Sequence, residues 1–291
     1  MFSFKRVFAL SCAAALLLTA VSCGGKGGSD PSETESAASG ETNAANEARS
    51  GFELKDAGET ALSAQLERLG VEYALIDPVP PDEAVVALFR QELEKGKAGG
   101  YTPVLLVDNG FLSDYLKTML DEGYSVKDEL EKPLPNAESF LAERLDGFED
   151  LLRADTGGAD EFMLAPSDVF SGTAGASFFG EQMDVLLVKL PTDKPWEAVL
   201  YLPFGGWNYC PAPLEMASVL KLWYESYGAV PAMISHDTLD MCLASPIPSD
   251  RAESAALQQI AFDEDLLMTG VSVSGLAKLL EASDIWSFWW D

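Results

Sequence analysis

The sequence predicts an α/β fold in which a mixed β-sheet is flanked by helices. Apolar runs of strand length alternate with segments whose apolar residues recur at helical spacing. The second half gives the order strand, helix, strand, strand, helix, helix, strand, which favours a mixed sheet. By length, residues 51–291 make one large or two small domains, and we divide them into an N-terminal α/β region at 51–180 and a C-terminal domain at 181–291.

The N-terminal region begins with alternating helix and strand signals. Leu62, Leu66 and Leu69 form one helical stripe, which Gly70 ends. A second helix is expected over PPDEAVVALFRQELEKG, residues 80–96, and GFLSDYLKTMLDEG predicts a third. VEYALIDP and TPVLLVDN read as strands, and the second is apolar throughout, which indicates cover on both faces.

After this alternation the helical signal is interrupted and then lost. Residues 125–153 are mostly helical but broken at Pro133 and Pro135. Residues 155–180 predict an irregular connection, and this stretch is the best candidate for a domain boundary.

The C-terminal region is more regular. We expect strands at MDVLLVKLP, WEAVLYLPF, VPAMIS, LDMCLASP and IWSFWWD. Helices are expected at PLEMASVLKLWYESYG, DRAESAALQQIAF and SGLAKLLEAS. Gly228 closes the first helix, and Asp250 and Glu253 have the spacing of an N-terminal capping pair for the second.

The first 50 residues predict export and anchoring. Lys5 and Arg6 precede a short uncharged run, as in a signal peptide at residues 1–22. Ala20 and Ser22 before Cys23 resemble the lipobox of bacterial lipoproteins, in which the cysteine is acylated; the alternative is an ordinary secretory signal. Residues 23–50 have the composition of a disordered linker. We therefore expect a cell-envelope protein, lipid-anchored to a membrane on the extracytoplasmic side.

The charge balance excludes several classes of partner. The chain has 19 Lys and Arg against 47 Asp and Glu, a net charge of −28, which argues against nucleic acid and against a polybasic membrane patch. No Asp-rich loop has the spacing of a calcium site, and the paired ligand spacing of zinc modules is absent. We therefore predict no metal and no cofactor.

Three motifs in the second half carry a family resemblance. PWEAVLYLPFGGWNYCP, KLWYESYGAVPAMISHDTLD and IWSFWWD, in this order, resemble the bacterial family known as domain of unknown function 4253. GKAGGYTPVLLVDN and KLPTDKPWE extend the likeness over most of residues 60–291. The family implies no activity, cofactor or catalytic residue.

Two turns carry the candidate site residues. If WEAVLYLPF and VPAMIS are parallel strands joined by the helix at 213–227, FGGWNYCP and SHDTLD lie at the same edge of the sheet, where open α/β sheets commonly bind ligands. The candidate binding residues are Trp207, Asn208, Cys210, His236 and Asp237. Glycine, Asn and Asp are also ordinary turn residues, so a purely structural role stays open.

A thiol enzyme is the alternative interpretation of these turns. His236 is the only histidine and would deprotonate Cys210 for nucleophilic attack, with Asp237 or Asp240 orienting the ring. Such a protein would be a hydrolase or an acyl transferase. Whether Cys210 and Cys242 form a disulfide is left open by the sequence.

The function that we favour from the sequence is binding rather than catalysis. All six tryptophans fall in the last 96 residues, and most of them are expected in the core. Trp207, beside two glycines in a loop, is expected to be partly exposed. Exposed aromatic rings stack on sugars, so the candidate ligands are a glycan, a cell-wall fragment or a protein.

Overall fold

The computed structural model describes residues 53–55, 60–77, 82–148, 167–171, 183–269 and 271–290. The signal peptide and linker expected at residues 1–50, and most of the irregular connection expected at 155–180, lie outside them. Within the described residues, no helix is both long enough and apolar enough to cross a membrane.

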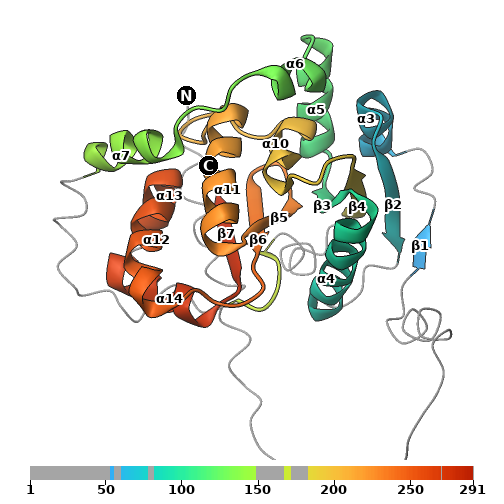
Figure 1. Ribbon diagram of the computed structural model, residues 1–291. Helices are drawn as coiled ribbons and strands as arrows, with labels where there is room; N and C mark the ends of the chain where they lie inside the picture. Colours follow the sequence, from blue (N-terminus) through green and yellow to red (C-terminus); the bar gives the residue numbers. More distant parts are fainter. Residues whose placement is uncertain are drawn as a thin grey trace, which may run out of the picture.

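The described strands form one seven-stranded mixed sheet, in the order β1-β2-β4-β3-β5-β6-β7 (Figure 1). Their bounds are Glu53–Lys55 (β1), Glu72–Asp77 (β2), Thr102–Asp108 (β3), Asp184–Leu190 (β4), Val230–Ile234 (β5), Thr238–Cys242 (β6) and Ile285–Trp289 (β7). The α/β fold class expected from the sequence is confirmed.

The pairing of the strands interleaves the two halves of the chain. β4 lies antiparallel between β2 and β3, and β3 is parallel to β5. β5, β6 and β7 follow as antiparallel neighbours. Because β3 comes before residue 180 and lies between two strands that come after it, the N-terminal and C-terminal regions share a single sheet.

Helices cover both faces of this sheet. Their bounds are Ala61–Leu69 (α3), Asp82–Gly99 (α4), Phe111–Asp121 (α5), Val126–Glu131 (α6), Ala137–Gly147 (α7), Ala198–Tyr201 (α10), Pro213–Tyr227 (α11), Ser249–Phe262 (α12), Asp265–Met268 (α13) and Val273–Ala282 (α14). Alternate residues of a strand point to opposite faces. Leu105 of β3 therefore belongs to the core that includes Phe89 of α4, and Leu106 to the core that includes Trp223 of α11.

The core on the α11 face is built largely from aromatic rings. Trp223 is fully buried, and its ring lies 4.9 Å from that of Phe262, 5.3 Å from Phe288 and 5.5 Å from Trp286 (centroid distances). Its indole Nε1 donates to Gln258 Oε1 at 2.9 Å. The expectation that most tryptophans serve the core holds for Trp223, Trp286 and Trp290.

The prediction of a strand at WEAVLYLPF is wrong. Pro195–Glu197 form a 3₁₀ turn, and α10 follows at Ala198–Tyr201. Proline at the start of the segment suits a helical first turn. Ala198, Val199 and Leu200 are all buried, so the run has no alternation that would mark a half-buried strand. β5 consequently has β3, not a strand at 196–204, as its parallel neighbour.

Two helix boundaries also differ from the expected ones. α12 begins at Ser249 with Pro248 as its N-cap, so Asp250 and Glu253 do not form a capping pair. The helix expected to end at Gly96 continues to Gly99, because the amides of Gly100 and Tyr101 still donate to the carbonyl oxygen of Gly96.

Asp263 covers part of the outer edge of β7. Its Oδ2 accepts from the backbone amide of Trp289 at 3.1 Å, and its Oδ1 accepts from the amide of Asp265 at 3.0 Å. An unpaired edge strand invites pairing with another chain, and a side chain that takes one of its amides blunts that edge. Burial raises the pKa of Asp263 well above its ordinary value.

Candidate functional site

The candidate site lies where the parallel strands β3 and β5 end. Leu106 pairs with Ile234, so the residues that follow these strands leave the sheet at the same edge. After β3, Asp108 Oδ1 accepts from the amides of Gly110 at 2.8 Å and Ser113 at 3.2 Å, which starts α5 directly above this edge.

The turn at residues 235–238, after β5, is organised by Asp237. Its Oδ1 accepts from the hydroxyls of Ser235 and Thr238, both at 3.0 Å. Its Oδ2 accepts from Trp289 Nε1 at 2.9 Å and lies 3.1 Å from His236 Nε2. Asp237 therefore fixes both the hairpin between β5 and β6 and the ring of His236, whose side chain is 35% exposed.

The turn at residues 204–211 is compact and needs its glycines. Gly205, Gly206 and Asn208 have φ of 100°, 89° and 45°. The amide of Gly206 donates to the carbonyl oxygen of Pro211 at 3.0 Å, and the amide of Cys210 donates to that of Trp207 at 2.8 Å. These bonds fold the segment back on itself and leave Asn208 and Tyr209 exposed.

Helix α5 links the two turns. Phe111, its first residue, has its ring centroid 5.2 Å from that of His236. Tyr115, one helical turn later, has its ring 5.4 Å from Trp207, and its hydroxyl donates to the carbonyl oxygen of Gly205 at 2.9 Å. Burial raises the pKa of Tyr115 to about 12, so this hydroxyl stays protonated and remains a donor.

The outer side of this arrangement exposes aromatic rings. In the described part of the chain, four large hydrophobic side chains are well exposed, and two of them, Phe111 and Tyr209, are each 63% exposed at this place. Trp207, in the same turn as Tyr209 and in ring contact with Tyr115 of α5, is half-buried, as the sequence led us to expect. We call the set Phe111, Trp207, Tyr209 and His236 the aromatic edge surface.

Cys210 lies beneath this surface rather than in it. Its side chain is buried in the core on the α11 face. Burial, and after it the carboxylate of Asp263, raises the pKa of the thiol. No hydrogen bond joins Cys210 to His236 in the described residues, and the histidine instead contacts Phe111 and Asp237.

The family comparison adds one finding. Residues 186–291 match the model of the family described as Domain of unknown function (DUF4253). This segment is similar to the DUF4253 family. The resemblance noted in the sequence is thereby confirmed for residues 186–291. Comparisons with curated proteins and with solved structures find no match.

The aromatic edge surface is not contained in the DUF4253 segment alone. Trp207, Tyr209 and His236 lie inside the segment, but Phe111 and the supporting Tyr115 come from α5, before it. β3, between β4 and β5, also comes from outside the segment. The structure thus joins the DUF4253 segment and the preceding region at this edge.

Sequence reasoning found the two turns but missed α5 as their link. It also placed them together by a wrong route, because residues 196–204 form no strand and the assumed crossover does not exist. Phe111 and Tyr209 were not singled out. One sequence feature could have identified Phe111 as exposed. It is an aromatic residue directly after Asn109 and Gly110, at the start of a helix whose buried side begins only with Leu112.

The two cysteines of the DUF4253 segment are free and buried. Cys210 belongs to the core on the α11 face, and Cys242 of β6 to the core on the α4 face, so the sheet separates them. In the described residues, no group of three or more His, Cys, Asp and Glu side chains has a geometry that holds a metal.

Both thiols are expected to resist alkylation in the folded protein. Burial raises the pKa of Cys242 to about 11 and that of Cys210 further, so little thiolate is present at pH 8. We expect labelling by iodoacetamide to be at least about a hundredfold slower than after denaturation, read at each residue by mass spectrometry. Fast native labelling of Cys210 would contradict its placement.

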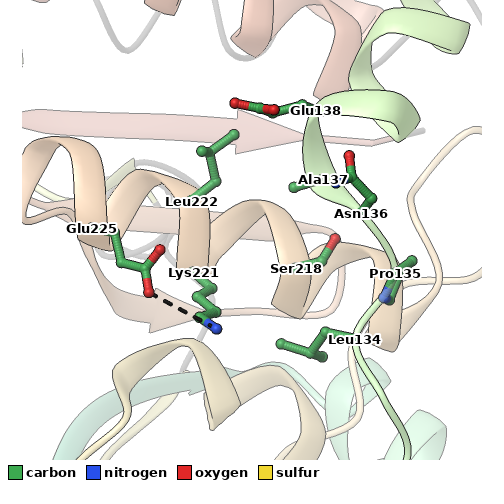
Figure 2. Close-up of a pocket in the computed structure, with 9 residues that line it drawn as sticks. All are labelled: Leu134, Pro135, Asn136, Ala137, Glu138, Ser218, Lys221, Leu222 and Glu225. Atoms are coloured by element: carbon green, nitrogen blue, oxygen red, sulfur yellow. Dashed lines mark ion pairs between the residues drawn. The ribbon is translucent and has the colours of Figure 1, made fainter.

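A separate pocket of about 280 Å³ lies between residues 134–138 and one face of α11 (Figure 2). Leu134, Ala137 and Leu222 give it apolar walls, and all three pack against the core. Glu138 and Glu225 also line it. This pocket combines α11 of the DUF4253 segment with chain that precedes that segment, and none of the candidate residues from the sequence lines it.

Proposed function

We propose that this chain is a lipid-anchored envelope protein whose folded part binds a sugar-containing ligand, such as a glycan or a cell-wall fragment, at the aromatic edge surface. The observation that carries the proposal is the exposure of Phe111 and Tyr209 beside the half-buried Trp207. Exposed rings of this size are costly to leave in water, and such patches commonly serve binding.

The polar groups around these rings support a sugar rather than an apolar ligand. The exposed side chain of Asn109 offers its amide nitrogen as a donor, while its Oδ1 accepts from the amide of Phe111 at 3.3 Å. His236 offers an imidazole that Asp237 holds in place. Aromatic faces accept the apolar faces of sugar rings, while amides and imidazole bond hydroxyls. The site also lies at the sheet edge where open α/β folds bind ligands.

A thermal-shift screen of the full chain against muropeptides and soluble glycans tests this proposal. A ligand that binds the folded state raises the melting temperature by an amount that grows with its concentration relative to its dissociation constant. We expect the shift to disappear in Trp207→Ala and in Phe111→Ser, because each removes a ring on which the sugar stacks. His236→Ala is expected to reduce the shift.

Tyr224→Ser is the matched control, because Tyr224 is also an exposed aromatic residue but lies on α11, beside the other pocket. It should leave the ligand-induced shift unchanged. A shift that survives in both Trp207→Ala and Phe111→Ser, or that is lost equally in Tyr224→Ser, would exclude the aromatic edge surface as the binding site.

The anchoring part of the proposal rests on the sequence around Cys23. In Cys23→Ser we expect incorporation of labelled fatty acid to be lost and the protein to leave the membrane fraction, since the acyl chains supply the attachment. Persistent membrane association of this variant would argue for another mode of attachment. Anchoring is measured by lipid incorporation and membrane fractionation, and ligand binding by the thermal shift, so either part of the proposal can fail without the other.

The thiol enzyme has less support than binding. A nucleophilic cysteine needs a lowered pKa and a base within hydrogen-bonding reach. The pKa of Cys210 is raised by burial, and His236 is engaged by Asp237 and Phe111. The geometry therefore favours Cys210 as a core residue beneath a binding surface.

A further inference from the structure

The pocket beside α11 has an apolar interior, and its charged lining residues are two glutamates and one lysine, Lys221. Leu134, Ala137 and Leu222 form the interior, and Figure 2 shows Glu138 at the top of the view and Glu225 at its left. The side chain of Glu225 is 59% exposed, and Glu138 is exposed as well. Exposed carboxylates around an apolar hollow suit a partner with an apolar anchor and flanking positive charges.

We propose that this pocket is a docking site for a basic amphipathic segment of a partner protein, which inserts an apolar side chain between Leu134 and Leu222 and places Lys or Arg near Glu138 and Glu225. Charge complementarity favours this occupant. The chain carries a net charge of −28, which attracts a cationic segment from a distance before the local contacts form.

The size of the pocket favours a side chain over a complete small molecule. Its volume of about 280 Å³ lies just below the range of about 300–1,000 Å³ that is usual for small-molecule sites. One wall is the side of α11, a helix of 15 residues, that carries Lys221, Leu222 and the exposed Glu225. A partner helix can lie along this side once its anchor is seated.

Aromatic rings next to the pocket add a second group that attracts a cation. Trp196 and the exposed Tyr224 have ring centroids 5.3 Å apart. Lys221 Nζ lies 5.7 Å from the centroid of Trp196 and 3.8 Å from Glu225 Oε1. Lys221 thus occupies a position with an aromatic face and a carboxylate, which are the groups that bind a cation. A Lys or Arg from the partner would compete with Lys221 for this position.

Fluorescence anisotropy of a labelled helical peptide tests the proposal with the full chain. The probe is a peptide of leucine and lysine with all leucines on one face, and the comparison probe replaces each lysine with glutamate. We expect the Leu/Lys peptide alone to bind. Glu225→Lys should weaken its binding about tenfold, because it removes one attraction and adds one repulsion. Leu222→Ser should also weaken binding about tenfold, through loss of apolar contact.

Two further variants separate local docking from general attraction. Glu94→Lys makes the same charge change on α4, at the other face of the sheet, and also removes one intrahelical ion pair. We expect it to change affinity by less than about twofold. Lys221→Met removes the competing cation and should tighten binding about threefold, a gain that a misfolded variant would not give.

The proposal stands if the pocket variants and Lys221→Met shift affinity in these opposite directions while Glu94→Lys does not. It is overturned if the Leu/Lys peptide does not bind, if the Leu/Glu peptide binds equally well, or if Glu94→Lys and Glu225→Lys weaken binding to the same extent. The test does not involve the aromatic edge surface, so its result is independent of the proposed glycan site.

Discussion

Gly205→Ala is expected to lower the free energy of unfolding by about 3 kcal/mol or more. Gly205 has a φ of 100°, and a Cβ added there would lie 2.1 Å from the carbonyl oxygen of Pro211. That oxygen belongs to the backbone and accepts from the amide of Gly206, so it does not move without opening the turn. The substitution should also displace Trp207 and weaken ligand binding at the aromatic edge surface.

Gly206→Ala is the control for this prediction. Gly206 also has a positive φ, of 89°, but a Cβ there would meet only atoms 4.0 Å away. We expect it to cost about 1 kcal/mol, from backbone strain alone. Urea unfolding of the full chain, followed by circular dichroism, measures both. Equal costs for the two alanine variants would contradict the described turn.

Trp223→Ala is expected to destabilise the protein by about 3–5 kcal/mol. The side chain is fully buried and packs against three aromatic rings from α12 and β7, so its removal leaves a large cavity between helix and sheet. Since a typical domain is stable by only about 5–15 kcal/mol, this variant should show a large loss of urea resistance.

Trp223→Phe and Trp196→Ala are informative comparisons. The first keeps a ring in the core but loses the bond to Gln258, so we expect a cost of about 1–2 kcal/mol. The second removes a half-buried tryptophan near the surface and should cost less than Trp223→Ala. A cost for Trp223→Ala no larger than that for Trp196→Ala would contradict the position of α11 on the sheet.

The sequence predicted most of the elements because their patterns are local. β3 shows an unbroken apolar run, and α11 shows an apolar stripe closed by Gly228, which takes a φ of 71°. Both patterns are properties of a few consecutive residues. The failure at WEAVLYLPF has the same origin, since a short apolar run that is buried all round fits a helix turn as well as a strand.

The order of the strands could not be predicted in this way. β5 pairs with β3, which lies more than 120 residues earlier, rather than with the preceding strand β4. No local sequence pattern determines which strand β5 pairs with, because the pairing depends on how side chains from distant segments pack on the two faces of β3 and β4. The sequence therefore predicted a mixed sheet correctly but gave the wrong parallel partner for β5.

The sequence predicted the two turns that carry the candidate residues, but not the helix that contacts both of them. Glycines, Trp207 and the single histidine marked the turns at 204–211 and 235–238. The contacts that join them run through Phe111 and Tyr115 of α5. Those contacts depend on where α5 lies over the sheet edge, which follows from the pairing of β3 with β5.

Hydrogen exchange of the full chain, with and without the ligand found in the glycan screen, tests the central claim most directly. The claim is that both turns and the start of α5 form one binding surface. We predict that the ligand slows exchange together at residues 109–116, 204–211 and 235–238, and leaves 134–138 unchanged. Slowing in only one of the three segments, or at 134–138 and α11 instead, would contradict it.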